Sequence, residues 1–338
     1  EVDQQALFTP ITKKTWTATS SERVPEMMRE AFRVANAPRK GPVQLNLPRN
    51  VLSGQAEFAA MQDPSDYRPV SLQAAPESSI NQAAGLLKNA ARPVIMVGGG
   101  IKNTAAGAPA MALAEAYNIP VVSSPGHGDA VPFGHPLNAG QMGPRGNPVA
   151  SRLVKEADVI LALGTRIGFN ATFYSYDNIN KEAKIIHVEQ EPTAIGRYFP
   201  VEMGIWGDAS TVAMQLLAAA DRLSQRAEAQ SWSDALKTER AGFLARRDAE
   251  ALIEGNPIQP SGLYKTLRDI CPQNSAYTMD AGTLCLQATD AMNYWQAKSL
   301  FTPLDFGLVG FSFAAGLGVK LAMPERPVIS LMGDGGFG

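Results

Sequence analysis

Short apolar runs alternate with helical patterns through the middle of the chain, between residues 77 and 222. Two of the runs, Pro93–Val97 and Val159–Leu163, are apolar along their whole length, which is typical of strands buried on both faces of a sheet. Strands that alternate with helices predict a parallel sheet with helices on both sides. We therefore expect residues 77–222 to form one complete, doubly wound, Rossmann-like α/β domain. The expected strands are 93–97, 119–123, 159–163, 183–188 and 203–206, and the expected helices are 79–90, 105–117, 148–157 and 209–220.

The regions on either side, residues 1–52 and 259–338, show parts of the same pattern. In the first region, Ser20 or Ser21 can cap a helix that ends at about Asn36. The fold class that follows is α/β, with doubly wound parallel-sheet domains in tandem. The elements expected in the flanks are a helix at 21–36 and a strand at 43–47, then a helix at 261–269 and strands at 276–280 and 328–332.

Two stretches of different composition separate these regions. Residues 53–76 contain three prolines and no sustained period, so we expect a linker there. Residues 223–258 are polar and rich in Ala, Arg and Glu, so we expect a second linker there, with a connecting helix.

The chain begins at Glu1 and stops at Gly338, directly after an apolar strand and a glycine turn. A parallel strand needs a crossover to reach the next strand. We therefore expect the chain to be an internal piece of a longer protein.

Composition narrows the class of partner. The chain has 338 residues, a formal net charge of −2 and 18% charged residues, so it lacks the basic surface that nucleic-acid binding requires. Its apolar runs are much shorter than the ~20 residues of a membrane-spanning helix. The two cysteines, Cys271 and Cys285, are too few for a disulfide framework. We expect a cytoplasmic protein that acts on a small molecule, with no nucleic-acid or membrane partner.

The sharpest candidate for chemistry is the run Gly333-Asp334-Gly335-Gly336, which follows the last expected strand. In open α/β sheets, ligands bind beyond the carboxyl ends of the strands. Glycines allow a diphosphate to approach the backbone, and the Asp334 carboxylate can hold a Mg²⁺ ion that bridges two phosphate oxygens. The alternative is a tight turn with a solvated aspartate.

Two further segments carry glycines at comparable places. Asp280-Ala281-Gly282-Thr283 also follows an expected strand, and two such strand ends in one domain favour a shared pocket, although an ordinary strand–turn–helix corner would look the same. The run 306–318 is apolar and rich in small residues, which allow a helix to approach the sheet or the backbone to approach a ligand. A packed helix explains the second half of this run but not its first glycines, at positions 307 and 310.

Together these three segments resemble the diphosphate-binding domain of thiamine-diphosphate enzymes, whose metal motif starts with a Gly-Asp-Gly turn after an apolar strand. Residues 1–52 resemble the last part of the pyrimidine-binding domain in that family, residues 77–222 its central domain, and residues 259–338 the first part of its diphosphate-binding domain. The resemblance implies thiamine diphosphate and Mg²⁺ as cofactors. It also implies a homodimer or homotetramer, because the active sites of this family lie between two chains.

The resemblance implies roles for individual residues. Asp334 would bind the metal ion, and Val309 would be the apolar wedge that bends the cofactor into its reactive shape. The glutamate that activates the pyrimidine ring and the second metal ligand, an asparagine, would lie outside this chain. The residues implied to bind the cofactor are Gly282, Thr283, Gly307, Leu308, Val309, Gly333, Asp334, Gly335 and Gly336.

Within the family, the chain is most similar to acetolactate synthases and sulfoacetaldehyde acetyltransferases. The opening Glu1–Gln4 and the runs 140–146, 162–166 and 204–209 favour the acetyltransferase, whereas Thr9–Lys13 favours the synthase. The resemblance therefore implies acyl transfer from sulfoacetaldehyde to phosphate, which yields acetyl phosphate and sulfite. An acetolactate synthase and a 2-oxo acid decarboxylase are the alternatives.

Neither branch is matched at every motif. Ile167–Asn170 stand where the synthases carry two aspartates and an arginine that help to seat flavin, so we expect no FAD or ADP in the central domain. Thr283-Leu284 replace the Gln-His of the synthases, and Val309 replaces their Met. Val309–Phe311 also depart from the Cys-Gly-Tyr of the acetyltransferases.

A non-catalytic nucleotide-binding module is the hypothesis from a different class. It would rest on the central domain alone, and it would not need Asp334 or the turn at 280–282. The histidines at 127, 135 and 187 are too scattered for a metal cluster, and His187, inside an apolar strand, is expected to be a packed residue.

Overall fold

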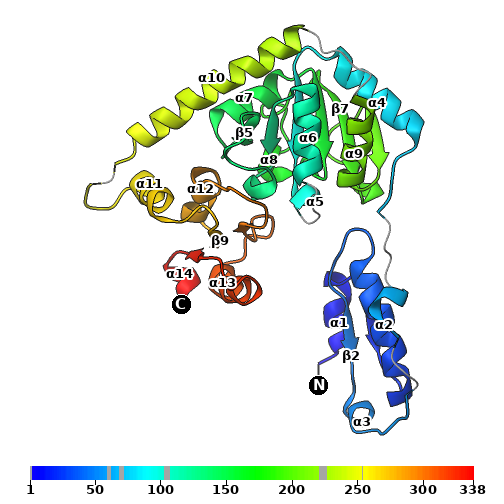
Figure 1. Ribbon diagram of the computed structural model, residues 1–338. Coiled ribbons are helices and arrows are strands. Elements are labelled where there is room, and N and C mark those ends of the chain that lie inside the picture. The colour runs from blue at the N-terminus through cyan, green and yellow to red at the C-terminus, as the bar shows by residue number, and fades with distance from the viewer. Residues whose placement is uncertain (1, 59–61, 68–71, 103–106, 221–226, 253) are drawn as a thin grey trace. The chain divides into compact units, whose positions relative to one another are not determined.

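The computed structural model describes all residues except 1, 59–61, 68–71, 103–106, 221–226 and 253 (Figure 1). The chain divides into two compact units, Glu1–Leu72 and Gln73–Gly338. Among the described residues, no helix is both long enough and apolar enough to cross a lipid bilayer.

The first unit is a small α/β layer around a two-stranded parallel sheet of β1 (Thr15–Thr17) and β2 (Gln44–Asn46). Its helices are α1 (Gln4–Phe8), α2 (Val24–Asn36) and α3 (Arg49–Leu52). Trp16, Met27 and Val51 bring the strand and two helices into one small core. The expected helix and strand are therefore present, whereas α1, β1 and α3 were not foreseen.

The expected cap of α2 is wrong. A single 3-10 turn, Ser21–Arg23, precedes the helix, and neither Ser20 nor Arg23, at the two N-cap positions, caps with its side chain. The Ser21 hydroxyl instead donates a hydrogen bond to the Val51 carbonyl at 2.6 Å. Ser21 thus ties the start of the helix to α3, a contact that sequence spacing does not reveal.

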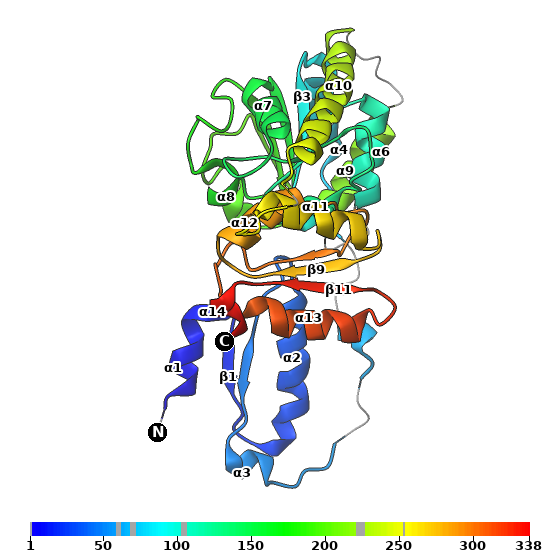
Figure 2. The ribbon, with the colours of Figure 1, turned by 90° about the vertical axis from the view of Figure 1, so that its left-hand side faces the viewer.

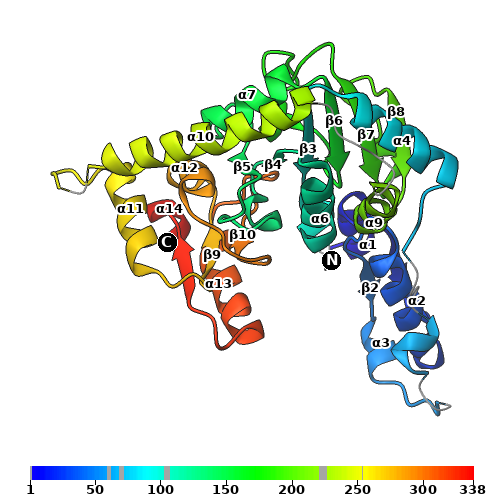
Figure 3. The same cartoon turned by 45° about the horizontal axis from the view of Figure 1, so that its top comes forward.

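A six-stranded, wholly parallel sheet forms the centre of the second unit, in the order β5-β4-β3-β6-β7-β8 (Figure 3). The order reverses direction between β3 and β6, as it does in a doubly wound sheet. The strands are β3 (Pro93–Val97), β4 (Val121–Ser123), β5 (Asn138–Gln141), β6 (Val159–Leu163), β7 (Lys184–Glu189) and β8 (Met203–Trp206). The expected α/β fold with a parallel sheet is confirmed.

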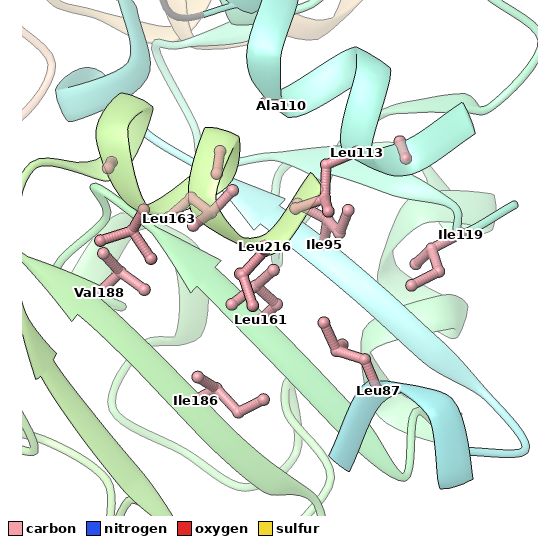
Figure 4. Packing of buried hydrophobic residues seen from close by; sticks show 14 of the residues in the cluster. Leu87, Ile95, Ala110, Leu113, Ile119, Leu161, Leu163, Ile186, Val188 and Leu216 are labelled. Carbon is pink, nitrogen blue, oxygen red and sulfur yellow. The ribbon is translucent and has the colours of Figure 1, made fainter. Parts of the chain in front are cut away.

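Helices cover both faces of this sheet, because successive strand residues point to opposite sides. Ile95, Leu161 and Leu163 pack against α4, α6 and α9 (Figure 4). Met96 and Ile160 point the other way, towards α7; Figure 2 shows α6 and α7 on opposite sides of β3. The helices are α4 (Glu77–Asn89), α5 (Gly99–Lys102), α6 (Gly107–Tyr117), α7 (Pro148–Glu156), α8 (Phe169–Thr172) and α9 (Ala209–Ala220).

The connecting helix expected within 223–258 is present as α10 (Ala227–Ala249), and it packs on the core of the central domain. Trp232 and Leu236 are buried in the same core as α7. The Trp232 indole N–H donates to the Pro93 carbonyl at 3.1 Å, and the Arg152 guanidinium lies over the ring at 5.2 Å. The polar composition of α10 reflects its wide exposed face, while two large side chains fix the helix to the domain.

The C-terminal part of the second unit contains a three-stranded parallel sheet in the order β10-β9-β11. Its strands are β9 (Ala276–Met279), β10 (Leu300–Phe301) and β11 (Val328–Leu331). Its helices are α11 (Pro260–Ile270), α12 (Thr283–Ala291), α13 (Phe311–Ala322) and α14 (Asp334–Phe337). Two-residue β10 and glycine-containing β5 were not expected, because neither carries the apolar run that marks a strand.

Helix α13 has one face on this sheet and one face exposed. Ser312, Gly316 and Val319 are buried towards β9 and β11. Phe313 and Leu321, on the other face, are 53% and 84% exposed. In the run 306–318, the residues before 311 therefore form a loop, and the residues from 311 onwards form a packed helix.

Candidate functional site

Two of the three glycine-bearing segments meet because β9 and β11 are parallel neighbours. The Asp280 N–H donates to the Leu331 carbonyl at 3.0 Å, so the residues after the two strands lie at one edge of the sheet. Figure 3 shows α14, which follows β11, at this edge. The proximity of the turns at Asp280 and Asp334 is thus a direct consequence of the strand order.

The buried carboxylate of Asp280 brings in the third segment. Its Oδ2 accepts a hydrogen bond from the Gly310 N–H at 2.9 Å, and its Oδ1 accepts one from the Phe311 N–H at 2.8 Å. The side chain is 2% exposed, so its charge is held by these backbone groups at the start of α13. The sequence places Asp280 in a candidate turn but does not by itself indicate a role for its side chain. A carboxylate directly after an apolar strand was the available signal.

Gly336 is fixed by the same carboxylate. A Cβ built on Gly336 would lie 2.0 Å from Asp280 Oδ2, which leaves no room for any side chain. Asp280 therefore touches both the turn after β11 and the start of α13. The close approach accounts for one glycine of the Gly333–Gly336 run by packing alone.

The other glycines of the site face open space. A Cβ on Gly333 or Gly335 would meet no atom within 4 Å, and the same holds for Gly282, Gly307 and Gly310. Gly282 and Gly307 also have positive φ angles, +107° and +73°, which glycine adopts without strain. Open backbone of this kind can be approached closely by a ligand.

Asp334 begins α14 beside these glycines, and its side chain is exposed. An exposed carboxylate next to open backbone suits a Mg²⁺–diphosphate group, because Mg²⁺ binds proteins through one or two carboxylates and the phosphates of its ligand. Thr283 starts α12 after Gly282, and Leu308 and Val309 are 46% and 57% exposed. The nine residues implied to bind the cofactor thus lie on three segments, two at adjacent strand ends and one tied to them through Asp280.

The glycines at positions 98–100 of the central domain, which follow β3, are packed closely, unlike the open glycines described above. A Cβ on Gly98 would lie 2.6 Å from the Gly164 carbonyl oxygen, and one on Gly100 would lie 2.7 Å from Gly164 Cα. These glycines let the turns that follow β3 and β6 approach each other at the point where the strand order reverses. Close packing of the two turns therefore explains the glycines at positions 98 and 100.

The histidines form no metal site in the described part of the chain. His187 is 1% exposed; its Nε2–H donates to the Thr165 carbonyl at 2.8 Å, and its Nδ1 accepts from the Gly196 N–H at 3.3 Å, so it is packed as expected. Burial, with the nearby Lys102 charge as the next cause, lowers the pKa of His127 to about 4. That imidazole is therefore neutral at pH 7.

A cavity of about 40 Å³ lies between α10, the loops around β5 and the end of α12. Arg240, Arg247 and Asp290 are among its lining residues, and none of the residues predicted to bind the cofactor is. A volume of this size holds a few water molecules at most. Most of the residues predicted to bind the cofactor are instead exposed at the surface.

Comparison with known proteins assigns the central part and the C-terminal part of the chain to domains of one enzyme family. The central domain of thiamine pyrophosphate enzymes matches residues 80–216, and their C-terminal TPP binding domain matches residues 280–338. A probable acetolactate synthase large subunit from Methanocaldococcus jannaschii is 31% identical over 348 residues, and a sulfoacetaldehyde acetyltransferase from Castellaniella defragrans is 32% identical over 358 residues. An acetolactate synthase large subunit from Corynebacterium glutamicum is 30% identical over 340 residues.

These alignments include the whole of this chain but only part of each relative. They cover 100% of the chain, and 58%, 59% and 53% of the three relatives, so the chain spans a little over half of their length. Both enzyme names expected from the sequence occur among the relatives. With two of the family's domains matched in their order along the sequence, the chain belongs to the thiamine pyrophosphate enzymes.

Proposed function

We propose that the complete protein containing this chain is a thiamine-diphosphate-dependent acyltransferase. The observation that carries the proposal is the exposed Asp334 carboxylate beside open glycine backbone, next to a second strand end. When bound, thiamine diphosphate supplies a stabilised carbanion that attacks a carbonyl group. The chain would supply the surface on which the cofactor is held and oriented.

The described residues divide this task between them. Asp334 would bind Mg²⁺, and Gly333, Gly335 and Gly282 would leave room for the diphosphate against the backbone. The apolar side chain of Val309 would press against the ring system and select its bent shape. Asp280 would hold the two neighbouring segments in register without touching the cofactor.

We propose sulfoacetaldehyde as the acyl source and phosphate as the acceptor, with acetyl phosphate and sulfite as products. The carbon–sulfur bond breaks, sulfite leaves, and the acetyl group passes to a phosphate oxygen. The similarity to the Castellaniella acetyltransferase supports this choice. So does the segment after Arg166: Ile167 is 2% exposed, and Asn170 donates to Asp305 Oδ1 at 3.2 Å, so neither presents an acidic group to a flavin.

An acetolactate synthase is the second candidate, favoured by Thr9–Lys13 and by the similarity to the Methanocaldococcus protein. A 2-oxo acid decarboxylase is the third. In each case we propose a homodimer or homotetramer as the working form.

Product analysis of the complete protein separates these candidates. With thiamine diphosphate and Mg²⁺ present, we expect sulfite release from sulfoacetaldehyde and acetyl phosphate only when phosphate is added. We also expect the purified protein to lack a flavin absorption band. Acetolactate from pyruvate without sulfite release would reject the first choice in favour of the synthase. Carbon dioxide and free aldehyde from a 2-oxo acid, with neither of the other products, would identify a decarboxylase.

A further inference from the structure

Strand β10 lies at one edge of the C-terminal sheet, with β9 on its inner side. On its outer side, the Ser299 and Leu300 N–H groups each donate to Asp129 Oδ2 at 3.0 Å. The Leu300 carbonyl accepts a hydrogen bond from the Lys102 ammonium group. A carboxylate and an ammonium group thus satisfy backbone groups that a further strand would otherwise pair.

These two side chains form a buried ion pair. Lys102 Nζ lies 2.9 Å from Asp129 Oδ1, and the side chains are 13% and 0% exposed. Burial raises the pKa of the Asp129 carboxyl, while Lys102 and the two backbone N–H groups act in the opposite direction. Removal of either partner would leave the other charge buried without compensation, which is strongly unfavourable.

Both residues belong to the central domain, at the carboxyl ends of its strands. Lys102 ends α5, which follows β3, and Asp129 lies in the 3-10 turn Gly128–Ala130, which follows β4. The carboxyl edge of the central sheet therefore holds the outer edge of the C-terminal sheet. The close approach continues at Gly126, where a Cβ would lie 3.2 Å from Leu304 Cδ2.

The chain runs from β10 directly into the segment that carries Val309. Halfway along, Asp305 pairs with Arg166, but both side chains are about half exposed, and such pairs contribute little. At its far end, the segment is fixed by the hydrogen bonds from Gly310 and Phe311 to Asp280. Residues 302–309 are thus held between two buried carboxylates, one from each domain.

We propose that Lys102 and Asp129 are positioning residues that fix the segment 302–309, and with it Val309, from the central domain. In this arrangement the central domain helps to shape the catalytic surface without contributing a group to it. The effect on catalysis rests on the proposed function, whereas the ordering of the segment does not. The two parts can therefore be tested separately on the complete protein.

The first test is hydrogen–deuterium exchange of the complete protein carrying Asp129→Asn. We expect faster exchange in peptides covering 302–309, by at least about threefold, because opening of the segment no longer breaks a charged contact. Peptides covering β9 should be unchanged. The matched control is Asp269→Asn, which removes the partner of Lys265 in an ion pair on α11 whose aspartate is 56% exposed. Unchanged exchange at 302–309, or an equal rise along the whole chain, would overturn the proposal.

The second test separates positioning from binding. Under the proposed function, Asp129→Asn should lower kcat by about 10- to 100-fold, since a small misplacement of a catalytic surface has effects of that size. The half-saturating concentration of thiamine diphosphate should change by a smaller factor than kcat, because Asp334 and its neighbouring glycines lie outside the loosened segment, whereas Gly307, Leu308 and Val309 lie within it. Faster exchange at 302–309 with an unchanged kcat would refute the role in catalysis alone. An inactive wild-type protein would refute the proposed function instead.

A paired variant guards against simple misfolding. In Lys102→Met with Asp129→Leu, no buried charge is left unpaired, so the melting temperature should recover relative to Asp129→Asn. A leucine side chain cannot accept the hydrogen bonds from the Ser299 and Leu300 N–H groups, so exchange at 302–309 should be at least as fast as in Asp129→Asn. If both the melting temperature and slow exchange at 302–309 recovered, the ion pair would contribute to stability without fixing the segment, and the proposal would fail.

Discussion

Asp280 and Asp334 stand one residue and three residues beyond neighbouring parallel strands, yet their surroundings are opposite. Asp280 is buried and occupied by backbone N–H groups, whereas Asp334 is exposed beside open glycine backbone. The glycine context was enough to select Asp334 from the sequence. The role of Asp280 depends on its contact with the start of α13. The two lie about thirty residues apart in the sequence, so no local pattern predicts the contact.

The exposure of Asp334 leads to a prediction about metal dependence. Asp334→Ala in the complete protein should abolish Mg²⁺-dependent binding of thiamine diphosphate, because alanine offers no oxygen atom to the metal ion. Asp334→Asn keeps the shape and one ligand oxygen, so it should weaken binding less. Calorimetric titration with and without Mg²⁺ measures both effects. Unaltered affinity in Asp334→Ala would remove this residue from the metal site.

At the scale of elements, prediction succeeded where apolar runs were long. β3 and β6 were predicted with the bounds that the structure shows, because both faces of these strands are buried. β5 was missed, since its sequence Asn-Ala-Gly-Gln has no strand-forming residue and its pairing is set by neighbouring β4. The helix α10 was expected, but its packing on the central domain was not, because two anchoring side chains in a polar helix give almost no periodic signal.

The packing of α10 can be tested at its main anchor. Trp232→Ala should lower the free energy of unfolding by about 3–5 kcal/mol, since it opens a cavity in the central core. Ser231→Ala, at an exposed neighbouring position on the same helix, is the control and should change stability by less than about 0.5 kcal/mol. Chemical denaturation provides both values. Equal, small effects would mean that α10 contributes little to the domain.

At the scale of the molecule, the central and C-terminal regions belong to one compact unit, and the boundary to the first unit falls at Leu72 and Gln73. The composition of the sequence predicts linkers at both 53–76 and 223–258. Composition could not distinguish them, because the contacts of α10 and of Lys102 with Asp129 are tertiary. We propose that only the first acts as a linker between independent units.

Limited proteolysis tests this division. We expect early cleavage within 53–76 and a resistant fragment that begins there and still contains β9 and α13, because α10 and the buried ion pair hold the rest together. Mass spectrometry of the fragments gives their ends. A first cut within 223–258 that separates 77–222 from the C-terminal region would contradict the expectation.

The contact between Gly336 and Asp280 affects how a mutational survey of this protein should be interpreted. Gly336→Ala would force a methyl group against the Asp280 carboxylate, while Gly335→Ala would place one in empty space. A growth selection would score both as harmful if Gly335 touches the cofactor, but for unrelated reasons. If substitution is harmful at Gly336 alone, the cause is the steric clash with Asp280. Only a harmful substitution at Gly335 would indicate that the bound cofactor lies against the backbone there.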